Sequence, residues 1–242
     1  MLTYTMEECC KILKFSQNIV SNSRTVEADT HEEYLLQILR MEVQHRNEAR
    51  KERLIKNAGF YTRKHFDTFR FDEVILPTSV DKDYLKECRF IDEKKNLVFF
   101  GNTGSGKSHL AQALGMEACK QNRSVKFFRT AALVNRLSEA KNEKNLSTLM
   151  NQIMKADLLV LDEWGYVPLD RDGARLLFEI ISECYETKSI IVTTNIEFTR
   201  WSTVLYDEQM TSALLDRLLH HCYLLIFNGD SDRMKNSLIR LT

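Results

Sequence analysis

The sequence has few residues that interrupt regular secondary structure, and it has no long apolar run. Only two prolines and eight glycines occur in 242 residues. No apolar run approaches the ~18 residues that a membrane-spanning helix needs. The N-terminal segment also lacks the basic start and continuous apolar stretch of a secretion signal. We therefore expect a chain rich in regular structure, with no membrane segment and a cytoplasmic location.

The six cysteines form no C-x-x-C pair, although such pairs are typical of zinc sites and redox motifs. The chain is also longer than the small secreted domains that depend on disulfides. We therefore expect reduced thiols and neither a zinc site nor a disulfide framework. The adjacent His220 and His221 invite a metal interpretation, but we favour polar or cationic roles at a helix end.

The net charge is zero, which hides a local imbalance. Residues 40–64 hold eight basic and three acidic side chains, a net charge of +5. A basic segment on a neutral protein is a candidate contact for nucleic acid. A solvated helix face has the same composition, so the charge alone leaves both interpretations open.

Two regions differ in pattern. Residues 1–65 are predicted to form a small helical domain, with a long helix starting near Thr30 and ended by Gly59. Residues 66–242 alternate short apolar runs with helical stretches, which predicts an α/β domain with a five-stranded parallel sheet and flanking helices. The expected strands are 97–100, 125–128, 158–161, 190–193 and 223–227.

The segment Gly101-Asn102-Thr103-Gly104-Ser105-Gly106-Lys107-Ser108 matches G-x-x-x-x-G-K-[ST] in full. It follows the first expected strand and opens a helix, as a phosphate-binding loop does. Glycines let the loop wrap so that backbone N–H groups point at phosphate oxygens, and the helix N-terminus adds positive charge. Lys107 can reach the β- and γ-phosphates, and Ser108 can ligate Mg²⁺. We expect this loop and the next residue, His109, to bind ATP.

Two further strands end in polar residues at the edge where parallel sheets bind ligands. Asp162 and Glu163 follow the strand 158–161. Asp162 suits the magnesium shell, and Glu163 suits the polarisation of an attacking water. Asn195 follows the strand 190–193 and could orient that water, or could simply cap a helix.

These elements resemble the AAA+ superfamily, and within it the IstB/DnaC clade of transposition helper ATPases and helicase loaders. The resemblance is carried by GNTGSGKSHLAQAL (101–114), ADLLVLDEWGYVPLD (156–170), IIVTTN (190–195) and ALLDRLLHHC (213–222). It is strong after residue 96 and weak before residue 65. IstB proteins usually differ at Asn102-Thr103, Ser105 and Thr194, but none of these departures removes an expected phosphate, magnesium or water ligand.

The resemblance implies further roles. Arg217 would be an arginine finger that reaches the ATP of a neighbouring subunit, although it could equally pair with Asp216 or Glu208 on its own helix. Arg233 would contact the γ-phosphate. Like the clade, the chain would lack a C-terminal lid domain, so ATP sites would be shared within a homo-oligomer. Arg136, Lys141 and Lys144 would meet DNA phosphates, or simply face solvent. Phe66, Phe69 and Phe71 would line the adenine pocket.

The leading hypothesis is an ATPase that uses Mg-ATP to oligomerise on double-stranded DNA and assists a transposase in target selection. The alternative is a DnaC-like loader of a replicative helicase that prefers single strands. A small-molecule kinase or a binding module with vestigial hydrolysis would also use a P-loop. An Asp-Glu pair suits water activation better than transfer to a small acceptor, and intact Lys107, Asp162, Glu163 and Arg217 argue against lost hydrolysis.

Overall fold

The computed structural model describes residues 4–229, and it divides the chain into two compact units, Met1–Arg53 and Leu54–Thr242. The boundary lies earlier than residue 65, where the sequence pattern placed it. The reason is packing: Ala58 is buried in the core of the second unit, and Leu54, Ile55 and Phe60 pack against that core. Arg233 lies outside the described residues.

The first unit is helical. Its elements are α1 (Met6–Ile12), α2 (Asn18–Asn22) and the first part of α3 (His31–Ala58), which Gly59 follows in a left-handed conformation with φ 87°. Cys10, Ile19 and Ile38 form its small buried core. Glu42 is buried beside that core, where it accepts hydrogen bonds from Ser16 and Arg46.

The second unit is an α/β domain whose sheet has six strands in the order β1-β6-β2-β5-β4-β3. The strands are β1 (Val74–Ile75), β2 (Asn96–Gly101), β3 (Val125–Arg129), β4 (Leu158–Trp164), β5 (Ser189–Thr194) and β6 (Cys222–Phe227). β2 to β6 are the five expected parallel strands. The prediction missed β1, a two-residue edge strand that pairs antiparallel with β6 and is too short to show a period.

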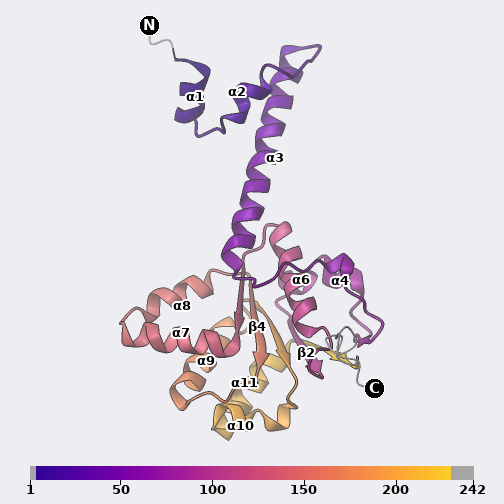
Figure 1. The fold of residues 1–242 in the computed structure, drawn as a ribbon, viewed down its shortest axis with the longest axis vertical. Helices are drawn as coiled ribbons and strands as arrows, with labels where there is room; N and C mark the ends of the chain where they lie inside the picture. Colours follow the sequence, from indigo (N-terminus) through magenta and orange to yellow (C-terminus); the bar gives the residue numbers. More distant parts are fainter. Residues whose placement is uncertain (1–3, 230–242) are drawn as a thin grey trace, which may run out of the picture. The chain divides into compact units, whose positions relative to one another are not determined.

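Helices cover both faces of this sheet (Figure 1). They are η1 (Phe66–Thr68), α4 (Lys82–Lys86), α5 (Arg89–Asp92), α6 (Lys107–Lys120), α7 (Thr130–Asn142), α8 (Leu146–Met154), α9 (Arg171–Cys184), η2 (Phe198–Arg200), α10 (Ser202–Leu205) and α11 (Glu208–His220). Side chains alternate between faces along each strand. Leu97 and Phe99 join the core under α4, α5 and α6, whereas Val98 joins the core under α7 to α11.

The described residues, 4–229, include no helix with an apolar stretch long enough to span a membrane. All six cysteines are free thiols. Burial raises the pKa of Cys88 and Cys184 to about 12, so these thiols stay protonated at neutral pH.

Candidate nucleotide-binding site

The loop between β2 and α6 has the conformation of a phosphate cradle. Gly106 precedes α6 with φ 95°, a left-handed value that glycine adopts without strain. At Gly101 a Cβ atom would lie 2.2 Å from the Phe227 carbonyl oxygen, so only glycine fits beside β6. The Lys107 ammonium group donates to the carbonyl oxygens of Gly101 and Asn102 at 2.7 and 2.6 Å, which places it inside the loop.

Asp162 is fully buried at the end of β4 and is the centre of a hydrogen-bond network. Its Oδ1 atom accepts from the hydroxyl groups of Ser108 and Thr193 at 2.8 and 2.5 Å. Its Oδ2 atom accepts from the hydroxyl of Tyr61. Burial and this bond to Asp162 raise the pKa of Tyr61 above its ordinary value of 10.0, so Tyr61 is the donor. Ser108 and Asp162 thus bring together oxygen atoms of the kind that Mg²⁺ prefers.

Glu163 is turned out of the strand by a local irregularity. It has φ 59°, and the pairing of β4 with β5 shifts between Leu161 and Trp164, as at a β-bulge. The Glu163 amide donates to the Thr193 hydroxyl at 3.0 Å, which anchors the turn. The Glu163 side chain is 40% exposed, and its carboxylate lies 3.5 Å from the Arg129 guanidinium, so it faces an accessible space.

A cavity of about 280 Å³ lies at this edge of the sheet. It is lined by Thr103, Gly104, Lys107, Ser108, Arg129, Glu163, Tyr166, Thr193, Thr194 and Asn195. Residues from three motifs far apart in the sequence therefore share one space. Asn195 does not cap the following helical turn, because that position is held by Glu197.

A second cavity of about 440 Å³ adjoins the same loop and is lined by Thr68, Phe69, Arg70, Asp72, Glu73, Val74, Ser105, Gly106 and His109. The rings of Phe69 and His109 meet edge to face at 5.4 Å. Phe66 and Phe71 are instead buried in the core, so of the three expected aromatic residues only Phe69 lines this space.

Arg217 is not among the residues that line either cavity. Its guanidinium donates to the Ala213 carbonyl oxygen at 2.9 Å and lies over the Phe178 ring. Within residues 4–229 it forms no ion pair with Asp216 or Glu208.

On the basic surface of α7 and its following loop, Lys141 pairs with Asp172 at 2.9 Å.

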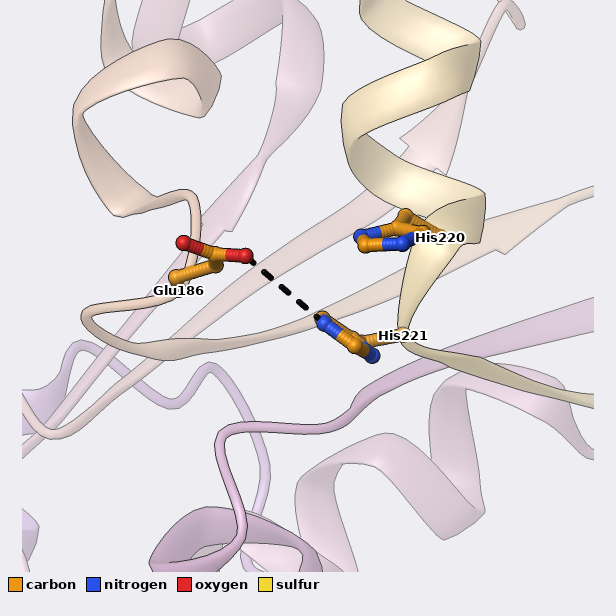
Figure 2. A group of neighbouring side chains, drawn as sticks. All are labelled: Glu186, His220 and His221. Atoms are coloured by element: carbon orange, nitrogen blue, oxygen red, sulfur yellow. Dashed lines mark ion pairs between the residues drawn. The ribbon is translucent and has the colours of Figure 1, made fainter.

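His220 and His221 lie beside Glu186 at the end of α11, and Figure 2 shows the three side chains converging. The ligand atoms lie within 4.8 Å of one another. However, the Lys95 ammonium is 3.2 Å from His221 Nδ1, and the Tyr185 hydroxyl is 2.9 Å from His220 Nδ1. The His221 ring therefore has protein partners at both nitrogens, since its Nε2 atom lies 3.8 Å from Glu186. We assign no metal to this group.

Sequence reasoning missed Tyr61, Thr193 and Arg129 as parts of the site. Thr193 carried a weak signal, because it is one of two threonines that follow the apolar run 190–192. Arg129 likewise ends its strand with a charge, but Lys126 is a second charge within that strand. Tyr61 carried no local signal, since 101 residues separate it from Asp162.

The fold and the site define the class of the protein: it is an α/β nucleotide-binding protein with a P-loop and an AAA+ core. Among solved structures, the DnaC helicase loader matches with a TM-score of 0.51 and 27% identity, over 69% of this chain and 98% of that chain. AMPPCP-bound DnaA from Aquifex aeolicus matches with a TM-score of 0.58 and 20% identity, over 76% and 58%, a likeness of fold alone.

The sequence profile of the IstB-like ATP binding protein family matches residues 13–239, and the chain belongs to that family. The ATP-binding protein of insertion sequence IS232 from Bacillus thuringiensis subsp. berliner is 35% identical over 207 residues, covering 84% of this chain and 82% of the relative. That of IS5376 from Geobacillus stearothermophilus is 35% identical over 209 residues, covering 85% and 82%.

Proposed function

We propose that this protein hydrolyses Mg-ATP, uses ATP to assemble on double-stranded DNA, and assists a transposase in target selection during transposition. The observation that carries the proposal is one cavity that is lined by Lys107, Ser108, Glu163 and Asn195. Asp162 accepts a hydrogen bond from the Ser108 hydroxyl at this cavity. The chain belongs to a family whose relatives are named for insertion sequences, and this supports a role in transposition.

The residues of the cavity suit hydrolysis of a triphosphate. The loop amides and Lys107 would bind the phosphates, and Ser108 and Asp162 would hold Mg²⁺, a cation suited to neutralising developing negative charge. Glu163 is exposed enough to accept a hydrogen bond from water and to polarise it for attack. Asn195 orients that water.

A site shared between subunits explains the position of Arg217. Its side chain is partly buried on α11 and lines neither cavity of its own chain. As an arginine finger it would complete the ATP site of a neighbouring copy, where a guanidinium stabilises charge on the transferring phosphoryl group. ATP binding and homo-oligomerisation would then be linked. The role of Arg233 in contacting the γ-phosphate remains part of this proposal.

The N-terminal unit supplies a basic surface for DNA. A hollow of about 480 Å³ within this unit is lined by Lys14, Phe15, Ser16, Glu42, His45, Arg46, Ala49, Arg50 and Arg53. Arg50 and Arg53 are exposed. Cations on an exposed helix meet backbone phosphates without reading base sequence, and such binding weakens steeply as salt is raised.

The experiment is an electrophoretic shift assay on duplex DNA with ATP, together with ATP turnover at several protein concentrations. Glu163→Gln is expected to trap an ATP-bound assembly on DNA, because it retains nucleotide and removes the group that polarises water. Lys107→Ala is expected to prevent assembly. Arg50→Ala serves as the DNA-contact variant: it should weaken the shift and leave nucleotide binding intact.

Two results would refute the proposal. One is turnover at full rate by an isolated monomer that is indifferent to dilution and to added duplex. The other is a phosphorylated small-molecule product, which would indicate a kinase. A normal rate in Glu163→Gln would remove Glu163 from the role of water-polarising group.

The alternative is a helicase loader, favoured by the 27% identity to the DnaC loader over 98% of that chain. The same shift assay separates the two functions. Preference for single-stranded over duplex oligonucleotides, and capture of a replicative helicase, would support the loader.

A further inference from the structure

Tyr61 belongs to none of the nucleotide-binding motifs, yet it reaches the buried carboxylate at their centre. It lies just beyond the end of α3, and its hydroxyl donates to Asp162 Oδ2. Tyr61 as a whole residue is 43% exposed, so part of it faces solvent while the hydroxyl points to Asp162.

The segment 60–62 is fixed to the ATPase core at each residue. The Phe60 ring packs at 5.7 Å against the Phe127 ring, and the tyrosine ring packs at 5.5 Å against the same partner. The amide and hydroxyl of Thr62 both donate to Gln112 Oε1, at 3.1 and 2.8 Å. The segment therefore holds the tyrosine hydroxyl in place over the carboxylate.

The Tyr61 hydroxyl occupies one of the positions on Asp162 that a metal ion or its water ligands could take. A carboxylate has about four lone-pair sites for hydrogen bonds or metal ligation. Oδ1 already accepts two hydroxyl groups, from Ser108 and Thr193. Oδ2 keeps the two positions that remain for magnesium or its water ligands, and the Tyr61 hydroxyl fills one of them.

We propose that Tyr61 is a latch on the magnesium site: its hydroxyl competes with magnesium-bound nucleotide for Asp162 Oδ2 and leaves that oxygen when the nucleotide binds. This inference rests on the proposed function, because it takes Ser108 and Asp162 as the magnesium ligands. It adds regulation to that site. Any event that draws the segment 60–62 away from the core frees Asp162 and favours magnesium-dependent binding of ATP.

The test is calorimetric titration of the full chain with a non-hydrolysable ATP analogue, in excess Mg²⁺ and separately in EDTA. Tyr61→Phe removes the hydroxyl but keeps the ring that packs on Phe127. With Mg²⁺ the variant is expected to bind about tenfold tighter than the wild type, because a competing hydrogen bond to a charged acceptor is gone. In EDTA the two proteins are expected to bind alike.

Tyr84→Phe is the matched control. Tyr84 also donates its hydroxyl to a carboxylate, that of Glu93 at 2.9 Å, but it lines neither cavity at the P-loop. Its loss is expected to leave the affinity unchanged with and without Mg²⁺. A gain in both variants would reflect loosening of the domain and would count against the latch.

A second measurement uses the wild type. In protein with ring-labelled ¹³C tyrosine, the Tyr61 resonance, assigned by its loss in Tyr61→Phe, is expected to shift with analogue plus Mg²⁺ and not with analogue in EDTA. Unchanged or weaker magnesium-dependent affinity in Tyr61→Phe, or a resonance indifferent to Mg²⁺, overturns the latch. Absence of magnesium-dependent binding in the wild type instead overturns the proposed nucleotide site.

Discussion

Thr193→Val tests whether one buried hydroxyl supports both carboxylates of the site. Thr193 is 1% exposed, donates to Asp162 Oδ1 at 2.5 Å, and accepts from the Glu163 amide at 3.0 Å. Valine has nearly the same shape, so the change removes polarity with little change in volume. Asp162 keeps its other donors, but the Glu163 amide loses its partner at a residue with φ 59°.

The magnitude follows from these two bonds. A hydrogen bond to a charged group contributes about 1.5–3 kcal/mol, and an unpaired buried donor costs about 1–3 kcal/mol. The Glu163 amide is only partly buried, so the second cost falls at the low end. We expect Thr193→Val to lower the free energy of unfolding by about 3 kcal/mol, which for a domain of this size lowers Tm by roughly 6–12 °C.

Calorimetric unfolding without nucleotide measures this loss. Thr193→Ser keeps the hydroxyl and is expected to lose only about 1 kcal/mol, for one buried methyl group. Thr203→Val is the control for the substitution itself, because Thr203 is exposed on α10, and a change within about 0.5 kcal/mol is expected. A Thr193→Val protein as stable as the wild type would refute the argument.

The remaining predictions concern stability outside the phosphate site. Burial acts to raise the pKa of Glu42, but hydrogen bonds from Ser16 and the charge of Arg46 outweigh it and lower that pKa below 4.5. The stability that Glu42 contributes is thus present above pH 4.5 and lost as the pH falls through the lowered value. Urea unfolding followed by circular dichroism should show this acid loss in the wild type and not in Glu42→Gln. Asp170 caps α9 by accepting from the Gly173 amide at 2.6 Å, so Asp170→Ala should cost about 1 kcal/mol in the same assay, whereas Asp170→Asn should cost little.

The sequence predicted those features that local pattern determines. The parallel strands were found because each is a short apolar run, and β2 to β5 are each followed by a helical period. The P-loop was found because its glycines, Lys107 and Ser108 all lie in one short segment of the chain, 101–108. Asp162 and Glu163 were placed at the site because a strand delivers them to the edge that already holds the P-loop.

What the sequence did not predict depends on contacts between distant segments. The Tyr61 contact with Asp162 forms only when the segment after α3 packs on β3, and no spacing rule links the two residues. The compact units meet at Arg53 and Leu54 for the same reason, since Ala58 and Phe60 join the core of the α/β domain by packing and not by composition. The strand β1 forms only through antiparallel pairing with β6, a contact between distant segments of the chain.

The charged groups of the site are each held by partners from their own chain. Lys107 donates to loop carbonyl oxygens, Asp162 accepts three hydroxyl groups, and Glu163 faces Arg129. A ligand that binds here must exchange some of these contacts, so the affinity measured is the difference between new and lost interactions. Substitutions that remove only a partner, such as Tyr61→Phe, should therefore strengthen binding, whereas substitutions of the charged groups themselves should weaken it. A general loss of stability would not raise nucleotide affinity in one variant and lower it in the other. The pair Tyr61→Phe and Lys107→Ala therefore tests the site even where both variants unfold at the same temperature.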